Sequence, residues 1–77
     1  MKIKAIVTLK EGVLDPQGKA ILQTLGGMNF SEVKEVRQGK YFEIDVNIED
    51  EKKAKSKVEE MCKQLLANLV IEDYKIL

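Results

Sequence analysis

Apolar and polar residues alternate along the first ten positions of the chain. This period of two is the pattern of a β-strand with one buried face. One face carries Ile3, Ala5, Val7 and Leu9, and the other carries Lys4, Ile6 and Thr8. The alternation predicts a first strand over residues 2–10.

A helix is predicted to begin at Pro16. Asp15 is of a residue type that caps the free N–H groups of a helix start, and Pro16 at the first helical position loses only an N–H that has no helical partner. The apolar side of this helix consists of Ala20, Ile21, Leu22 and Leu25. Gly26 and Gly27 follow where a left-handed residue is expected to end the helix.

Two further strands are predicted in the middle of the chain. Residues 33–38 have the composition of a short strand, and Gly39 separates them from a second alternating run. That run places Phe42, Ile44, Val46 and Ile48 on one face. Two strands that meet at Gln38 and Gly39 indicate a hairpin.

The last third of the chain changes from a helical to a strand pattern. Between residues 50 and 68, apolar residues recur at the three- and four-residue spacing of a helix. They are Ala54, Val58, Met61, Cys62, Leu65, Leu66 and Leu69. Residues 70–77 return to strand composition.

The order strand, helix, strand, strand, helix, strand predicts an α+β fold. The simplest arrangement is a βαββαβ two-layer sandwich in one domain, residues 1–77, with an antiparallel sheet and both helices on one face, as in ferredoxin-like domains. The other sheet face is then uncovered, and we expect it to include Ile6 and one or more of Tyr41, Ile71 and Leu77. Such a partly apolar face in a small domain predicts self-association as a dimer or tetramer.

Composition restricts the possible partners. The 77 residues include 13 Lys and Arg and 13 Asp and Glu, so the formal net charge is zero. This balance argues against nucleic acid or an anionic membrane as a partner. The single cysteine and the lysines among the first ten residues argue against a disulfide framework and a signal peptide, and predict a cytoplasmic protein.

The sequence shows no catalytic, cofactor-binding or metal-binding site. Five residues separate Gly12 from the Gly18-Lys19 pair, whereas a phosphate-binding P-loop needs four, and Ala20 has no hydroxyl for magnesium. No histidine is present, which removes the commonest general base and metal ligand. Cys62 lies in the apolar stripe without a base to activate it, so we interpret it as a packing residue.

Arg37 and Lys40 flank the turn residue Gly39. Long cationic side chains at a turn can reach a carboxylate or phosphate on a partner, although solvent-exposed charge is the simpler interpretation from the residues alone. Two other hypotheses stay open. One is a ferredoxin-like regulatory module that binds a small metabolite between protomers, and the other is a small enzyme that uses Cys62, which requires an exposed thiol.

Three segments together resemble the PurS family, the small subunit of phosphoribosylformylglycinamidine synthase. They are "LKEGVLDPQGKAI", "VRQGK" and "LLANLVIEDYKI", and the resemblance extends over nearly the whole chain. Leu69 departs from the pattern, because the family has a proline between Asn68 and Val70. This difference concerns the turn before the last strand and the end of the second helix.

The resemblance implies a non-catalytic subunit of a glutamine- and ATP-dependent ligase in purine biosynthesis. The implied partners are a large synthase subunit, which uses ATP and magnesium, and a glutaminase subunit. A small subunit of this kind brings the two together and aids the transfer of ammonia between their active sites. By this resemblance, Arg37 and Lys40 become the expected partner-binding residues, and Asp15, Pro16 and Gly39 the expected structural ones.

Overall fold

The computed structural model describes all residues from 1 to 77 and contains three strands and two α-helices. The elements are β1 (Lys2–Leu9), α1 (Pro16–Gly27), β2 (Gly39–Asp45), α2 (Glu51–Met61), the π-helical turn η1 (Cys62–Leu66) and β3 (Glu72–Ile76). Neither helix is long and apolar enough to cross a membrane.

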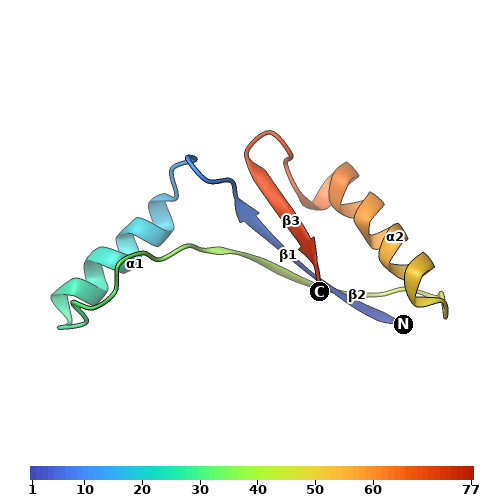
Figure 1. Cartoon of the computed structure of the whole chain (residues 1–77), viewed down its shortest axis with the longest axis horizontal. Coiled ribbons are helices and arrows are strands. Elements are labelled where there is room, and N and C mark those ends of the chain that lie inside the picture. Colours follow the sequence, from blue (N-terminus) through green and yellow to red (C-terminus); the bar gives the residue numbers. More distant parts are fainter.

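The three strands form one antiparallel sheet in the order β2-β1-β3. The predicted α+β class, its antiparallel sheet and the ferredoxin-like order of segments are confirmed. The strand predicted for residues 33–38 is wrong: these residues form no strand, and the predicted hairpin at Gln38 and Gly39 is absent. Residues 33–38 pair with no strand and lead into β2, which pairs with the central strand β1 (Figure 1).

The core lies between α2 and one face of the sheet. Its buried members are Ile3, Ala5, Val46, Ala54, Val58 and Cys62. The alternation predicted for the first strand is confirmed, because Ile3, Ala5 and Val7 are buried while Lys2 and Lys4 are exposed. Cys62 is fully buried, and this burial raises the pKa of its thiol. An enzyme that uses an exposed Cys62 thiolate is inconsistent with this position.

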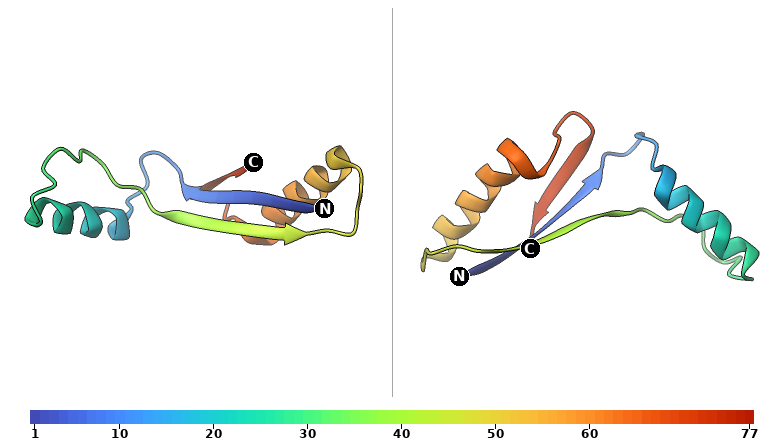
Figure 2. Two further views of the ribbon diagram at one scale, coloured as in Figure 1. Left: turned by 90° about the horizontal axis from the view of Figure 1, so that it is seen from below. Right: turned by 180° about the vertical axis from the view of Figure 1, so that it is seen from behind.

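The helix α1 does not cover the sheet. It projects from the end of β1, and residues 28–38 run back beside it to reach β2 (Figures 1 and 2). We call residues 11–38 the arm. The expectation that both helices lie on one sheet face is therefore wrong, since only α2 packs against the strands. The arm makes the molecule long, with extents of 48 × 24 × 14 Å.

The ends of the helices differ in part from the prediction. α1 begins at Pro16 as expected, but it continues through Gly26 and Gly27, and the left-handed residue is Asn29, with φ of 72°. At the other helix, Asp50 caps the start by accepting hydrogen bonds from the N–H groups of Lys52 and Lys53. Helical structure there ends at Leu66, so Leu69 lies in the following turn and does not lengthen the helix.

The uncovered sheet face is more polar than expected. Ile6 is half-buried there and pairs with Tyr41 on one side and Lys75 on the other. The neighbouring pair of Lys4 and Glu43 is charged. Ile71 lies in the turn before β3 and not on this face.

The chain exposes much more surface than a compact protein of its mass. Its solvent-accessible surface is 5958 Å², whereas about 4,700 Å² is typical of a compact monomer of 8.7 kDa. The radius of gyration is 15.8 Å, against about 11–12 Å for a compact chain of this length. An excess of about 1,200 Å² is comparable to one partner's share of a stable protein interface, about 800 Å².

Candidate interaction site at the base of the arm

The segments "GVLDPQG" and "VRQGK" meet where the arm leaves the sheet. Asp15 joins them with its two carboxylate oxygens. Oδ1 accepts a hydrogen bond from the Gly18 N–H at 2.9 Å, and Oδ2 accepts one from the Gln38 N–H at 2.9 Å. The first bond caps α1, with Pro16 at the first helical position, and the second ties the helix start to the returning segment.

These hydrogen bonds make Asp15 a stronger acid. Its pKa is lowered from the ordinary value of 3.8, first by the hydrogen bond from the Gln38 N–H and then by that from the Gly18 N–H. The nearby Arg37 guanidinium contributes in the same direction. Because each bond favours the charged carboxylate, Asp15 is ionised at neutral pH and holds both partners as an acceptor.

Glycine is required at position 18 by close packing. A Cβ atom there would lie 2.3 Å from the Val36 carbonyl oxygen and 2.7 Å from Asp15 Oδ2. Gly39 has a similar constraint, since a Cβ atom would lie 2.5 Å from the Val7 carbonyl oxygen. The two glycines let the chain pass close to α1 and then to β1, which places the arm at a fixed angle to the sheet.

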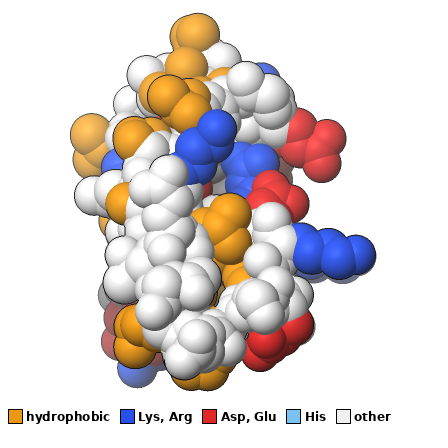
Figure 3. Space-filling view, turned by 90° about the vertical axis from the view of Figure 1, so that its left-hand side faces the viewer, with side chains coloured by type: hydrophobic (Ala, Val, Ile, Leu, Met, Phe, Trp, Pro, Cys, Tyr) orange, Lys and Arg blue, Asp and Glu red, His pale blue; other side chains and the backbone are white.

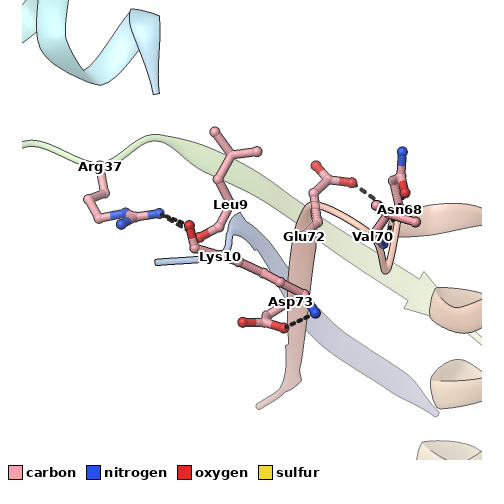
Figure 4. A network of polar contacts seen from close by, with 7 residues as sticks. All are labelled: Leu9, Lys10, Arg37, Asn68, Val70, Glu72 and Asp73. Carbon is pink, nitrogen blue, oxygen red and sulfur yellow. Dashed lines mark hydrogen bonds and ion pairs between the residues drawn. The ribbon is translucent and has the colours of Figure 1, made fainter. Parts of the chain in front are cut away.

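The two cations expected to face partners both make contacts within the chain. Arg37 donates hydrogen bonds to the carbonyl oxygens of Leu9 and Lys10 (Figure 4). It also forms an ion pair with Glu35 at 3.9 Å. Lys40 lies 3.9 Å from Glu72 of β3, and the Lys40 side chain is 62% exposed. Arg37 therefore secures the end of β1 to the arm, whereas most of Lys40 remains accessible.

Two surface hollows flank the base of the arm. One, of about 430 Å³, lies between α1 and the returning segment, and its lining includes Leu14, Lys19, Lys34 and Arg37. The other, of about 380 Å³, opens beside the sheet and includes Val7, Gln38, Lys40 and Glu72. Neither contains a group of three or more side chains suited to hold a metal ion.

Apolar side chains along the arm remain in contact with solvent. Leu14 is 63% exposed, Met28 59%, Phe30 45% and Ile21 41%. The view onto the end of the arm shows several separate patches of hydrophobic side chains among backbone, polar and charged groups (Figure 3). Gly18 is the one buried residue of α1. Ile21 was predicted to lie on the apolar side of a helix that covers the sheet, so its exposure was not predicted.

A short charged sheet, a helix detached from it and exposed apolar residues define a small α+β protein whose arm presents apolar surface to its surroundings. The comparison with known families agrees. Residues 2–77 match the PurS family, described as phosphoribosylformylglycinamidine (FGAM) synthase. The chain belongs to the PurS family, and it is a non-catalytic small subunit of this ligase of purine biosynthesis.

Relatives of known name are similar over almost their full length. The PurS subunit of phosphoribosylformylglycinamidine synthase from Bacillus subtilis is 50% identical over 74 residues, which are 96% of this chain and 87% of that protein. The crystal structure of PurS from Methanocaldococcus jannaschii, one of the subunits of formylglycinamide ribonucleotide amidotransferase, is 49% identical with a TM-score of 0.89. It covers 99% of this chain and 92% of its own.

A chain in the PurLQS structure from Thermotoga maritima also superposes. It is 34% identical, has a TM-score of 0.87, and covers 100% of this chain and 96% of its own length. Because both structural matches include the arm, the detached position of α1 is shared with solved relatives.

Replacing Gly18 by alanine should destabilise the protein, although the same change elsewhere in a helix is usually favourable. The new methyl group clashes with the Val36 carbonyl oxygen, which we expect to cost about 1–3 kcal/mol of unfolding free energy. Gly26→Ala is the matched control, since a Cβ atom there meets nothing within 4 Å. Denaturant unfolding followed by circular dichroism checks both variants, and a Gly18→Ala protein as stable as Gly26→Ala contradicts the close packing.

Replacing Asp15 by asparagine should lower stability in a pH-dependent way. The amide keeps one acceptor oxygen and loses the other, and we expect the melting temperature at pH 7 to fall by about 4–8 °C. Because the folded-state pKa of Asp15 is lowered, its contribution is complete above 3.8 and is lost as the pH falls through the folded value. The two proteins should therefore converge in acid. A difference in melting temperature between the two proteins that stays constant from pH 7 to pH 2 would show that the ionised Asp15 carboxylate does not cause the effect.

Proposed function

We propose that the chain self-associates through its arm and, as a dimer or tetramer, brings together the large synthase subunit and the glutaminase subunit of the FGAM synthase complex. The observation that supports this most is the detached arm, which exposes Leu14, Ile21, Met28 and Phe30 to solvent. In this role the large subunit uses ATP and magnesium, and the glutaminase releases ammonia. The small subunit keeps the two active sites in a fixed relative position. The complex works in the cytoplasm, and residues 1–77 act as one unit.

Self-association follows from the excess surface. The arm has no covering layer within its own chain, and burying apolar area stabilises by about 25 cal/mol per Å². Contact with a second copy can bury the exposed apolar side chains of both arms at once, since a twofold contact uses the same patch on each protomer. The arm is a better candidate than the uncovered sheet face, because that face presents Lys4, Glu43 and Lys75 around Ile6.

Partner contacts by Arg37 and Lys40 remain a proposal. Of the two, Lys40 is the one available to another subunit, because its side chain is mostly exposed and its pairing with Glu72 is at 3.9 Å. Pairs of this length at the surface contribute little and exchange easily. Arg37 acts through the arm, which it holds against Leu9 and Lys10.

Replacing Ile21 by aspartate should shift the protein toward monomer. The substitution places a charge on the exposed apolar side of α1, and we expect the dissociation constant for self-association to rise at least about tenfold. Ile6→Lys on the uncovered sheet face is the comparison and should remain associated. Sedimentation equilibrium measures both. Dissociation by Ile6→Lys but not by Ile21→Asp would move the contact to the sheet.

Omitting the chain should uncouple the two reactions of the complex. With purified large and glutaminase subunits from the same organism, we expect FGAM formation from glutamine to fall by at least about tenfold, because ammonia then crosses solvent between separate proteins. Formation from added ammonium chloride should persist. Restoring the chain should restore the glutamine-dependent rate. An unchanged rate of FGAM formation without the chain would refute the proposed function.

The isolated chain should neither hydrolyse glutamine nor bind ATP.

A further inference from the structure

The returning part of the arm contains a segment of strand composition that pairs with nothing in its own chain. Residues 33–38, with the sequence VKEVRQ, lead into β2 without reversing direction (Figures 1 and 2). The main-chain N–H and C=O groups of residues 34–37 make no hydrogen bond within the chain. The next N–H, that of Gln38, bonds to the Asp15 side chain. Free main-chain groups of this kind can pair with the edge of a sheet.

The strand β2 has an open edge. It is an outer strand of the sheet, and its one partner is β1. Directly after β2, Val46 exchanges hydrogen bonds of 2.9 and 2.7 Å with Met1, so its main-chain groups face β1. Successive residues of a strand direct these groups to opposite sides, so those of Tyr41, Glu43 and Asp45 face outward. They have no partner in the single chain.

One chain cannot join its own two unpaired edges. Residues 33–38 and β2 follow each other along one direction, and no turn at Gln38 and Gly39 folds the segment back. A second copy removes this obstacle. When a twofold axis passes near Gln38 and Gly39, the two chains run antiparallel there, and residues 33–38 of each lie beside β2 of the other. Both open edges are then paired, since a twofold contact is made twice.

We propose that residues 33–38 of a second copy add an antiparallel strand to the open edge of β2, so that two chains exchange the strand that each lacks. This inference rests on the proposed function, to which it adds the place where the arm docks. Each half of the dimer then has the order β3-β1-β2, followed by the exchanged strand. These are the four strands that the alternation in the sequence predicts, with the pairing made between chains.

The start of α1 lies on the sheet face that α2 covers. The hollow of about 380 Å³ is lined by Pro16 and Gln17 together with Val7 and Lys40, which pair across β1 and β2 on that face. A twofold axis between antiparallel strands is perpendicular to the sheet, so the α1 helix of the second copy arrives on this same face. Phe42 is half-buried there and lies outside the cluster against which α2 packs. The exchanged helix therefore has apolar surface to cover.

Lengthening the junction tests the exchange. An Asn-Gly insertion between Gln38 and Gly39 supplies a two-residue hairpin turn, which allows residues 33–38 to fold back onto β2 of their own chain. We expect self-association to weaken at least about tenfold in sedimentation equilibrium, because the strand pairing is then made within one chain. Helical content, measured by circular dichroism, should match the parent. The same insertion between Glu49 and Asp50, both exposed residues before α2, is the matched control and should leave self-association unchanged.

Glu43→Pro provides a second variant, in case the insertion disturbs folding. Proline removes the outward N–H of residue 43, which has no partner in the single chain, and proline is accepted on edge strands. We expect self-association to weaken at least about tenfold while the pairing of β2 with β1 persists. Glu43→Ala removes the same side chain but keeps the N–H, so it should associate like the parent.

The outcomes separate the exchange from the proposed function. Weaker self-association in the junction insertion and in Glu43→Pro, with helical content kept and both controls unaffected, supports the exchange. A folded variant of either kind that associates like the parent overturns the exchange and leaves self-association through the arm standing. A parent that is monomeric at micromolar concentration overturns the proposed function and this inference together.

Discussion

The position of the arm depends on the Asp15 carboxylate. Its two oxygens join the first turn of α1 to the segment that returns to β2, with hydrogen bonds of 2.9 Å to Gly18 and Gln38. The helix α1 does not pack against the sheet, so its orientation depends on these hydrogen bonds, whereas α2 is held by packing against the core. Arg37 adds a second bridge by holding the carbonyl oxygens at the end of β1. Together the Asp15 and Arg37 hydrogen bonds fix the angle at the base of the arm, a feature that we call the corner.

That corner divides the chain into parts with different sources of stability. The sheet and α2 share a small core around Ala5, Val58 and Cys62, all fully buried. The arm has hydrogen bonds at its base but exposes Leu14, Ile21 and Met28 along its length. A fold with about 1,200 Å² of surface beyond that of a compact monomer is suited to assembly. The proposed contact of the arm with a second copy gives this surface a use.

Local signals in the sequence predicted much of the fold. The alternation at Ile3, Ala5 and Val7 predicts β1, and the Asp15-Pro16 pair predicts the start of α1, because capping and strand period act over a few residues. Residues 33–38 were misassigned because a segment of strand composition pairs only where a neighbouring strand is available, which no local pattern records. The detachment of α1 could not be predicted either. An apolar helix side looks the same in sequence whether it covers its own sheet or another chain.

The same distinction applies to the candidate site. Arg37 and Lys40 are conspicuous in sequence as cations beside a turn, but the backbone acceptors of Arg37 come from residues 27 and 28 positions earlier. The need for glycine at position 18 arises from Val36, which lies 18 positions later in the sequence, so only the folded chain reveals it. By contrast, the exposure of Val70 and Ile71 was not predicted, because the sequence analysis placed both residues in the last strand, which begins only at Glu72.

The claim that the arm is completed by a second copy can be tested by amide hydrogen exchange at several protein concentrations. We expect protection of the α1 amides to rise over the concentration range in which the molar mass changes from one chain to an oligomer, because contact with a partner suppresses local opening. Amides of β1 that pair within the sheet should show much less change. Strong protection of α1 at concentrations where the protein is monomeric would contradict this claim, since the arm would then be stable without a partner.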